Sequence, residues 1–149
     1  MHSIHDNLLV SYEVECETRT ITLRTEKRLE GKPTERTNVH FVGVEGYHFE
    51  NDAFGNIIFG LEEVPLEQFF SNYGQEITES YRMAGSPAPW AANLSSAVSV
   101  LRNKAIQAFV LSSSYGLSGW VLAREVAIVP AHKALQWTRQ KRRATELIR

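Results

Sequence analysis

The spacing of apolar residues changes at Pro65, and this change constrains the fold more than any other feature of the sequence. Before Pro65, apolar residues recur at every second position over 8–16, and the same alternation returns over 18–25. This is the period of a β-strand with one buried face. After Pro65, apolar residues over 66–73 recur every three to four positions, which is typical of an amphipathic helix. The sequence therefore predicts a β-rich first half followed by helical segments.

The same patterns locate the individual elements. In the first half we expect an antiparallel meander, with a charged loop over 27–35 and strands over 8–16, 18–25, 37–44, 47–50 and 56–61. We expect a helix from Pro65 that ends at Gly74, since proline suits the first helical position and glycine the position past the end. We then expect a short helix over 76–84, broken by the Gly-Pro-rich segment 85–89, and helical spacing over 94–101. Two strands over 106–112 and 119–129, joined by a hairpin loop, precede a final helix from about 131.

These elements predict one α+β domain over 1–130, followed by a basic C-terminal helix or tail over 131–149. The domain would be a curved antiparallel β-sheet with one or two packed helices. A chain of 149 residues with 43% hydrophobic and 22% charged residues can bury a core without metals or disulfides. Its single cysteine, Cys16, excludes an intrachain disulfide. Cys16 closes an alternating apolar series, so we expect it in the core.

The chain shows neither a signal-peptide pattern at its start nor an apolar run long enough to cross a bilayer, so we expect a cytoplasmic protein. Its formal net charge of −1 hides a strong asymmetry. Residues 132–149 carry six basic side chains against one acidic side chain, a net charge of +5, which leaves −6 for the remainder. We therefore expect the surface that the basic tail contacts to be acidic, whether in this chain or in another.

The densest run of reactive side chains is 47–52. If Tyr47 and Phe49 point to the core, strand alternation places His48 and Glu50 together on the other face, with Asp52 in the following turn. Such a cluster could serve general acid–base chemistry or hold a cation. The alternative interpretation is an exposed strand face that leads into a turn.

Two further groups of residues have simpler interpretations. His2, His5 and Asp6 could ligate a metal, but we expect Asp6 to hold the entry to the first strand and His5 to pair with it. The segment 113–119 matches neither a nucleophile elbow nor a phosphate-binding loop, and we expect it to form a hairpin turn. We expect no catalytic residue, no metal site and no cofactor.

Large and basic side chains in loop or terminal positions form the candidate partner surface: Trp90, Trp137, Arg139, Arg142 and Arg143. Trp120 lies within a strand pattern and is expected in the core. Nucleic acid is not the expected ligand of the tail, because a recognition motif and a wider basic surface are missing. A protein partner or a homodimer is expected instead.

Several segments of the first half resemble one group of known proteins. These are 5–10, 19–23, 41–44, 47–49, 56–59 and 61–64. The pattern resembles small uncharacterised bacterial β-meander proteins with an N-terminal His-Asp, some of them grouped with immunity proteins of polymorphic toxin systems. The resemblance covers 4–64 and implies a binding protein without an active site. The expected function is thus a non-enzymatic intracellular protein-binding, immunity-like module. The alternative is a small-molecule-binding or hydrolase-like enzyme that uses His48, Glu50 and Asp52.

Overall fold

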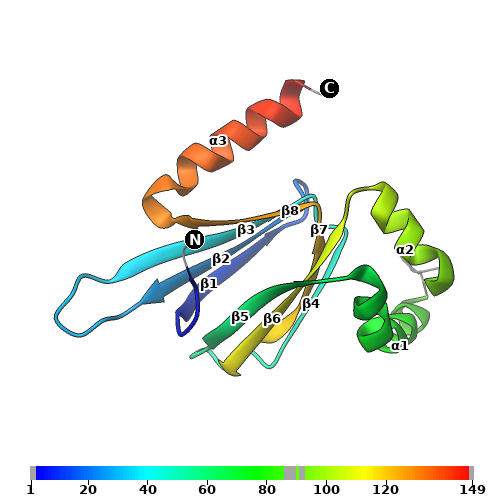
Figure 1. Ribbon diagram of the computed structural model, residues 1–149, viewed down its shortest axis with the longest axis horizontal. Helices are drawn as coiled ribbons and strands as arrows, with labels where there is room; N and C mark the ends of the chain where they lie inside the picture. The colour runs from blue at the N-terminus through cyan, green and yellow to red at the C-terminus, as the bar shows by residue number, and fades with distance from the viewer. Residues whose placement is uncertain (1–2, 86–89, 91–92, 148–149) are drawn as a thin grey trace.

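The computed structural model describes residues 3–85, 90 and 93–147. In chain order, the elements are β1 (Leu8–Glu15), β2 (Thr20–Lys27), β3 (Glu35–Val42), β4 (Gly46–Glu50), β5 (Ile57–Val64), α1 (Leu66–Ala84), α2 (Leu94–Asn103), β6 (Gln107–Tyr115), β7 (Ser118–Ala123), β8 (Glu125–Pro130) and α3 (Ala131–Leu147). The fold is α+β, as predicted (Figure 1). Within the described residues, no helix is both long and apolar enough to span a membrane.

All eight strands belong to one antiparallel sheet, in the order β4-β7-β6-β5-β1-β2-β3-β8. The predicted meander is right for β1, β2 and β3, which pair in sequence. It is wrong after β3, because β4 pairs with β7 and β5 pairs with β1 and β6. β6 and β7, which pair with β5 and β4, come from the second half of the chain, so alternation in the first half could not reveal these two pairings.

The sheet is curved, as predicted, and the bend lies where β3 passes into β4 and β7 into β8. Only residues 43–45 separate β3 from β4, and only Arg124 separates β7 from β8. Pairing continues across the bend, because the Arg124 amide donates to the Val42 carbonyl (3.0 Å) and the Glu45 amide to the Leu122 carbonyl (2.8 Å). The sheet thus divides into two halves, β1-β2-β3-β8 and β5-β6-β7-β4, that face each other (Figure 1).

The first hydrophobic core lies between these halves. Alternate residues of β2 and β3 face it, so Ile21, Leu23, Val39 and Phe41 are fully buried. The opposite half contributes Phe109 of β6, whose ring centroid lies 5.8 Å from that of Phe41. The first core explains why the alternation over 18–25 is so regular.

Two expectations for the first strand are wrong, one at a bulge and one at the strand end. The register with β2 shifts between Leu9 and Ser11, so Leu9 is buried whereas Val10 is 56% exposed. Val10 is the extra residue of the bulge and has no partner in the register with β2, whereas Val14 packs against the first core as the alternation predicts. Cys16, predicted to be in the core, is exposed just beyond the end of β1.

The second core lies on the outer face of β6 and β7, beneath α1 and α2. Phe69, Leu101 and Leu122 are fully buried there, and Trp120 is 6% exposed, which confirms its predicted core position. The predicted break at Gly74 is wrong, since α1 is one continuous helix over Leu66–Ala84. A β-carbon on Gly74 would lie 3.2 Å from Leu94 Cδ1, so the absence of a side chain lets α2 pack closely. Tertiary packing therefore compensates for a poor helix former.

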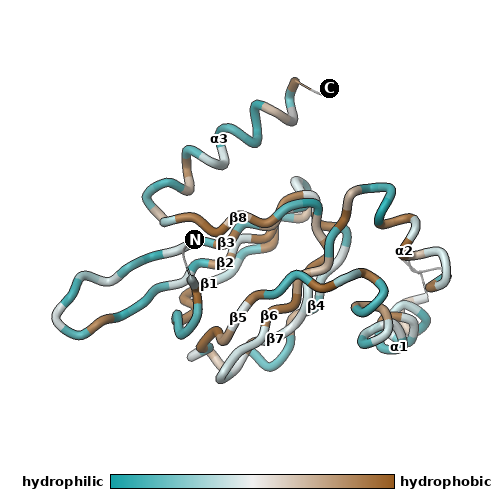
Figure 2. Tube along the Cα trace, viewed as in Figure 1, coloured by the Kyte–Doolittle hydropathy of each residue, from teal (hydrophilic) through white to brown (hydrophobic). Residues whose placement is uncertain are grey.

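The third helix, α3, follows β8 without a loop and lies over the outer face of the β1-β2-β3-β8 half (Figure 1). Ala134 is its only buried hydrophobic residue within the described part of the chain, whereas Leu135 is 71% exposed. Figure 2 shows α3 as largely hydrophilic, in contrast to the hydrophobic strand β8 that precedes it. The outer faces of the two half-sheets are therefore covered in chemically different ways.

Candidate functional site

The predicted cluster of His48, Glu50 and Asp52 forms only in part. His48 and Glu50 share one face of β4, as alternation requires, with 3.5 Å between His48 Nε2 and Glu50 Oε2. Both side chains are more than half exposed. The Trp120 ring of β7 lies behind His48, with 6.3 Å between the ring centroids. The pair thus lies on an open strand face.

Asp52 belongs to a different set of contacts. Its Oδ1 accepts hydrogen bonds from Asn56 Nδ2 and the Phe54 amide (both 2.9 Å), and its Oδ2 accepts from the Tyr12 hydroxyl (3.1 Å). These bonds, that from Asn56 above all, lower the pKa of the Asp52 carboxyl. Asp52 therefore holds the loop before β5. Among the described residues, no three His, Cys, Asp or Glu side chains are grouped so that they could hold a metal.

Two minor sequence expectations are also resolved. His5 Nε2 lies 3.4 Å from Asp6 Oδ2, which confirms their pairing, and His5 Nδ1 contacts the Phe59 carbonyl at 2.6 Å. His2 lies outside the described residues. The segment 113–119 forms the predicted hairpin turn between β6 and β7, where the Ser113 hydroxyl donates to the Leu117 carbonyl.

Trp90, predicted as part of a partner surface, is a core residue. It is only 2% exposed and belongs to the second core. Its indole Nε1 donates to the Glu45 carbonyl at 3.3 Å, and its ring packs edge-on against Phe70 and Tyr81. Preceding prolines suggested an exposed loop, but burial of a large ring under α1 is more favourable than its exposure.

Trp137 attaches α3 to the sheet. Its ring stacks on the imidazole of His40 in β3, with centroids 4.9 Å apart and an interplanar angle of 18°. One turn further along, Lys141 donates to both carboxylate oxygens of Glu125 at 2.6 Å. The basic helix thus contacts one acidic residue of its own chain.

The three predicted arginines of α3 have different surroundings. Ala134, Trp137 and Lys141 share the face that packs on the sheet, because residues three and four apart lie on one side of a helix. Arg139 and Arg143 are exposed on another side, whereas Arg142 flanks the packed face. Among the described residues, no acidic side chain forms an ion pair with any of these three arginines.

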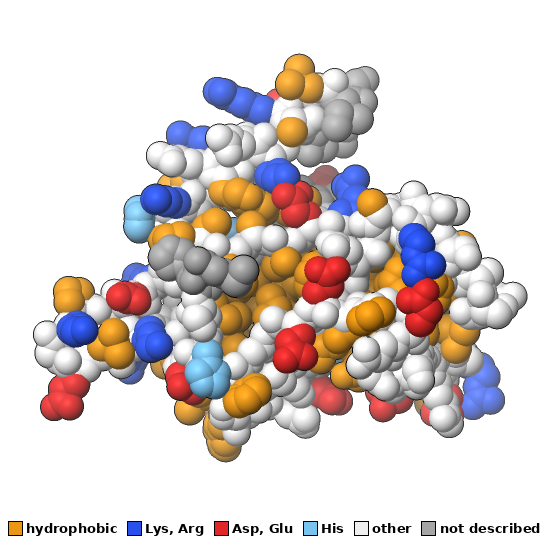
Figure 3. Space-filling model, in the orientation of Figure 1, with side chains coloured by type: hydrophobic (Ala, Val, Ile, Leu, Met, Phe, Trp, Pro, Cys, Tyr) orange, Lys and Arg blue, Asp and Glu red, His pale blue; other side chains and the backbone are white. Residues whose placement is uncertain are grey.

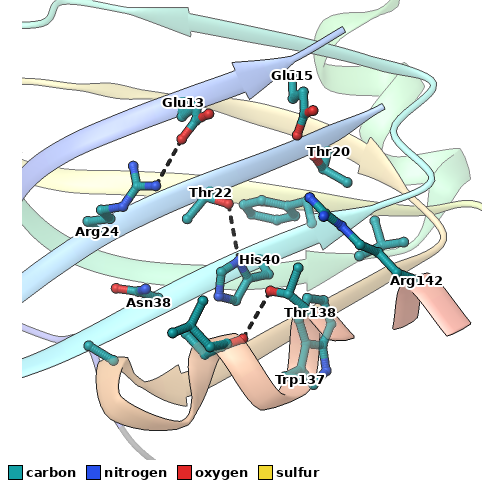
Figure 4. A pocket seen from close by; sticks show the side chains of 15 residues that line it. Glu13, Glu15, Thr20, Thr22, Arg24, Asn38, His40, Trp137, Thr138 and Arg142 are labelled. Atoms are coloured by element: carbon teal, nitrogen blue, oxygen red, sulfur yellow. Dashed lines mark hydrogen bonds and ion pairs between the residues drawn. The ribbon is translucent and has the colours of Figure 1, made fainter. Parts of the chain in front are cut away.

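Arg142 lines a hollow of about 360 Å³ between α3 and the outer face of β1, β2 and β3 (Figure 4). Polar side chains of the strands form its floor and far side, and residues of α3 form its near side. The full lining is Glu13, Glu15, Thr20, Thr22, Arg24, Asn38, His40, Phe41, Val42, Ala131, Ala134, Leu135, Trp137, Thr138 and Arg142. We call this hollow the α3 cavity.

His40 occupies the floor of the α3 cavity. Its Nδ1 lies 3.1 Å from the Thr22 hydroxyl, while its buried Nε2 has no hydrogen-bond partner. Desolvation, and then the nearby positive charge of Arg24, lower the pKa of the His40 imidazole. The neutral ring is therefore favoured.

The sequence reasoning missed the α3 cavity. Its strand residues alternate with buried ones and thus have the pattern of an ordinary solvated face, and no motif connects them with α3. Comparison with known proteins adds no family to this geometry: no protein-family model matches the chain, and no curated protein or solved structure matches it either.

Proposed function

We propose that the protein is a non-enzymatic protein-binding module that takes an acidic partner on the exposed side of α3. The observation that supports the proposal is the division of charge on this helix. Lys141 pairs with Glu125, whereas Arg139 and Arg143 project from the other side of α3 and form no ion pair with an acidic side chain in the described part of the chain. Figure 3 shows basic side chains along the visible side of α3. Arginine is well suited to such surfaces, because its guanidinium pairs with carboxylates in a fixed geometry.

The position of α3 on the sheet is compatible with a role in partner binding. The helix starts directly after β8, so its position is defined at one end, while most of its surface remains exposed. Complementary charge speeds association and selects partners more than it adds affinity. Residues 4–64 resemble small bacterial β-meander proteins, some of them grouped with immunity proteins, and this resemblance implies the same class of function, in which surface complementarity with another protein replaces catalysis.

The experiment compares three forms of the tagged chain in affinity purification from its native cells at low salt. The forms are the wild type, the double variant Arg139→Glu and Arg143→Glu, and a control with Lys32→Glu and Arg82→Glu. The control reverses two exposed basic residues away from α3. We expect an acidic protein to be enriched with the wild type and the control, and about tenfold less with the α3 variant.

Three results would contradict the proposal: enrichment that is equal for all three forms, loss of the partner from the control as well, or recovery of nucleic acid in place of protein. Light scattering on the purified chain adds a direct test of the partner's identity. If the wild type dimerises and the α3 variant does not, the acidic partner is a second copy of the chain.

A small-molecule-binding or hydrolase-like activity on β4 is the second candidate. The contact between His48 and Glu50 at 3.5 Å favours it, because a carboxylate can orient an imidazole for proton transfer. Asp52 would have to leave Tyr12 and Asn56 to join them. Hydrolysis of a model ester that is lost in His48→Ala and kept in His132→Ala would support this candidate.

A further inference from the structure

The α3 cavity contains two opposite charges without partners. The Glu15 carboxylate comes from β1 and the Arg142 guanidinium from α3, and neither forms an ion pair with any described residue. In Figure 4, Arg142 reaches from the helix toward the side of the cavity where Thr20 and Glu15 lie. The other two charged groups of the cavity already neutralise each other, because Arg24 Nη2 lies 2.8 Å from Glu13 Oε2.

The remaining lining adds both polarity and apolar surface. Thr20, Thr22 and Asn38 supply hydroxyl and amide groups. Leu135 and Trp137 supply an apolar side from the helix. A volume of about 360 Å³ falls within the range of small-molecule sites, which are mostly apolar with a few convergent polar groups.

We infer that the α3 cavity binds a small zwitterion, an apolar α-amino acid, whose ammonium group pairs with Glu15 and whose carboxylate pairs with Arg142. The apolar side chain of the ligand lies along Leu135 and Trp137.

The balance of charge is the reason for choosing a zwitterion. The cavity holds two carboxylates and two guanidiniums, so an anion alone would leave Glu15 without a partner and a cation alone would leave Arg142 without one. A ligand with both charges satisfies both groups, and charge-assisted hydrogen bonds are the strongest that such a ligand can form. Glu15 and Arg142 lie on different elements, so the bound ligand also joins α3 to β1.

Calorimetric titration of the full chain tests the inference with leucine, phenylalanine and tryptophan, each as the free L-amino acid, its amide and its N-acetyl derivative. The amide lacks the carboxylate and the N-acetyl form lacks the ammonium group. We expect at least one free amino acid to bind, and both of its derivatives to bind about tenfold more weakly or worse, because each loses one charge-assisted contact.

Matched variants identify the two side chains. Glu15→Gln and Arg142→Gln should each weaken binding by about tenfold or more. Glu17→Gln and Arg82→Gln should leave it unchanged, since these exposed residues do not line the cavity. Hydrogen exchange supplies a second measurement: the bound amino acid should slow amide exchange in α3 of the wild type but not of Arg142→Gln.

The inference is overturned if none of the three amino acids binds at millimolar concentration. It is equally overturned if amides and N-acetyl derivatives bind as well as the free amino acids, or if both charge variants bind like the wild type. None of these results depends on a protein partner, so failure of this inference can be distinguished from failure of the proposed function.

Discussion

Two helical layers cover the two outer faces of the same sheet, and they do so by different physical means. Over β6 and β7, α1 and α2 pack through fully buried apolar and aromatic side chains such as Phe69 and Leu101. Over β3 and β8, α3 rests on a ring stack, an ion pair and one buried alanine. The first layer is part of the structural core. The second leaves charged groups and a cavity accessible, which is what a binding surface requires.

The largest effect is expected in the α1–α2 layer. Trp120→Ala removes the ring that packs edge-on against Phe69, with centroids 5.1 Å apart. Replacement of a buried tryptophan by alanine leaves a void that the surroundings fill only partly, so we expect a loss of about 3–5 kcal/mol in the free energy of unfolding. Urea denaturation followed by circular dichroism measures it. A loss below about 1 kcal/mol would show that this layer is not part of the core.

The equivalent change in the α3 layer should be smaller. Trp137 is only partly buried, and its main contact is the stack on His40. We expect Trp137→Ala to lower the free energy of unfolding by about 1–2 kcal/mol, because a stacked pair contributes little beyond the area that it buries. Trp137→Phe, which keeps an aromatic ring, serves as the control in the same urea titration. A loss equal to that of Trp120→Ala would remove the contrast between the layers.

A pH titration gives a smaller, directional effect for the α3 layer. The pKa of His40 is lowered in the folded chain from its ordinary value of 6.5, so the unfolded chain binds more protons as the pH falls below that value. The stability that neutral His40 contributes is complete above about pH 6.5 and decreases as the pH falls toward the lowered pKa. We expect His40→Gln to reduce this acid-dependent loss when thermal unfolding is measured at several pH values. An unchanged pH profile would contradict the assignment.

The smallest effect is expected for the ion pair that holds the middle of α3. Both Lys141 and Glu125 are partly exposed, so solvent and salt screen their interaction. We expect Glu125→Gln to cost at most about 1 kcal/mol, and the difference from the wild type to shrink in high salt. Glu30→Gln, an exposed carboxylate in the loop between β2 and β3, is the control. A loss that persists at high salt would indicate a packing role for Glu125.

The secondary structure followed closely from local pattern, and its errors have local causes. The strands and the final helix lie near their predicted positions, because alternation and helical spacing record which faces are buried. Gly74 misled the prediction, since its helix is stabilised by contact with Leu94 of another element. Val10 misled it because the bulge between Leu9 and Ser11 interrupts the alternation, and Cys16 misled it because β1 ends at Glu15.

The candidate site was much less predictable than the fold. The sequence predicted a cluster of His48, Glu50 and Asp52 because these residues are close in the chain. In the structure, Asp52 instead forms hydrogen bonds with Tyr12 and Asn56. The α3 cavity instead combines residues that lie up to about 130 positions apart, from Glu13 to Arg142. Each of them alone resembles an ordinary surface residue, so sequence patterns carry no sign of their proximity.

By itself, the sequence determined the α+β class, the position of most strands and helices, and the opposite charges of the body and the C-terminal helix. These properties depend on neighbours within a few positions or on simple sums of charge. Only the tertiary structure decided that β4 pairs with β7, that Trp90 is buried and that α3 lies over His40. These contacts join distant segments, and their free energy depends on packing and on the loss of water from both partners at once, which local patterns do not encode.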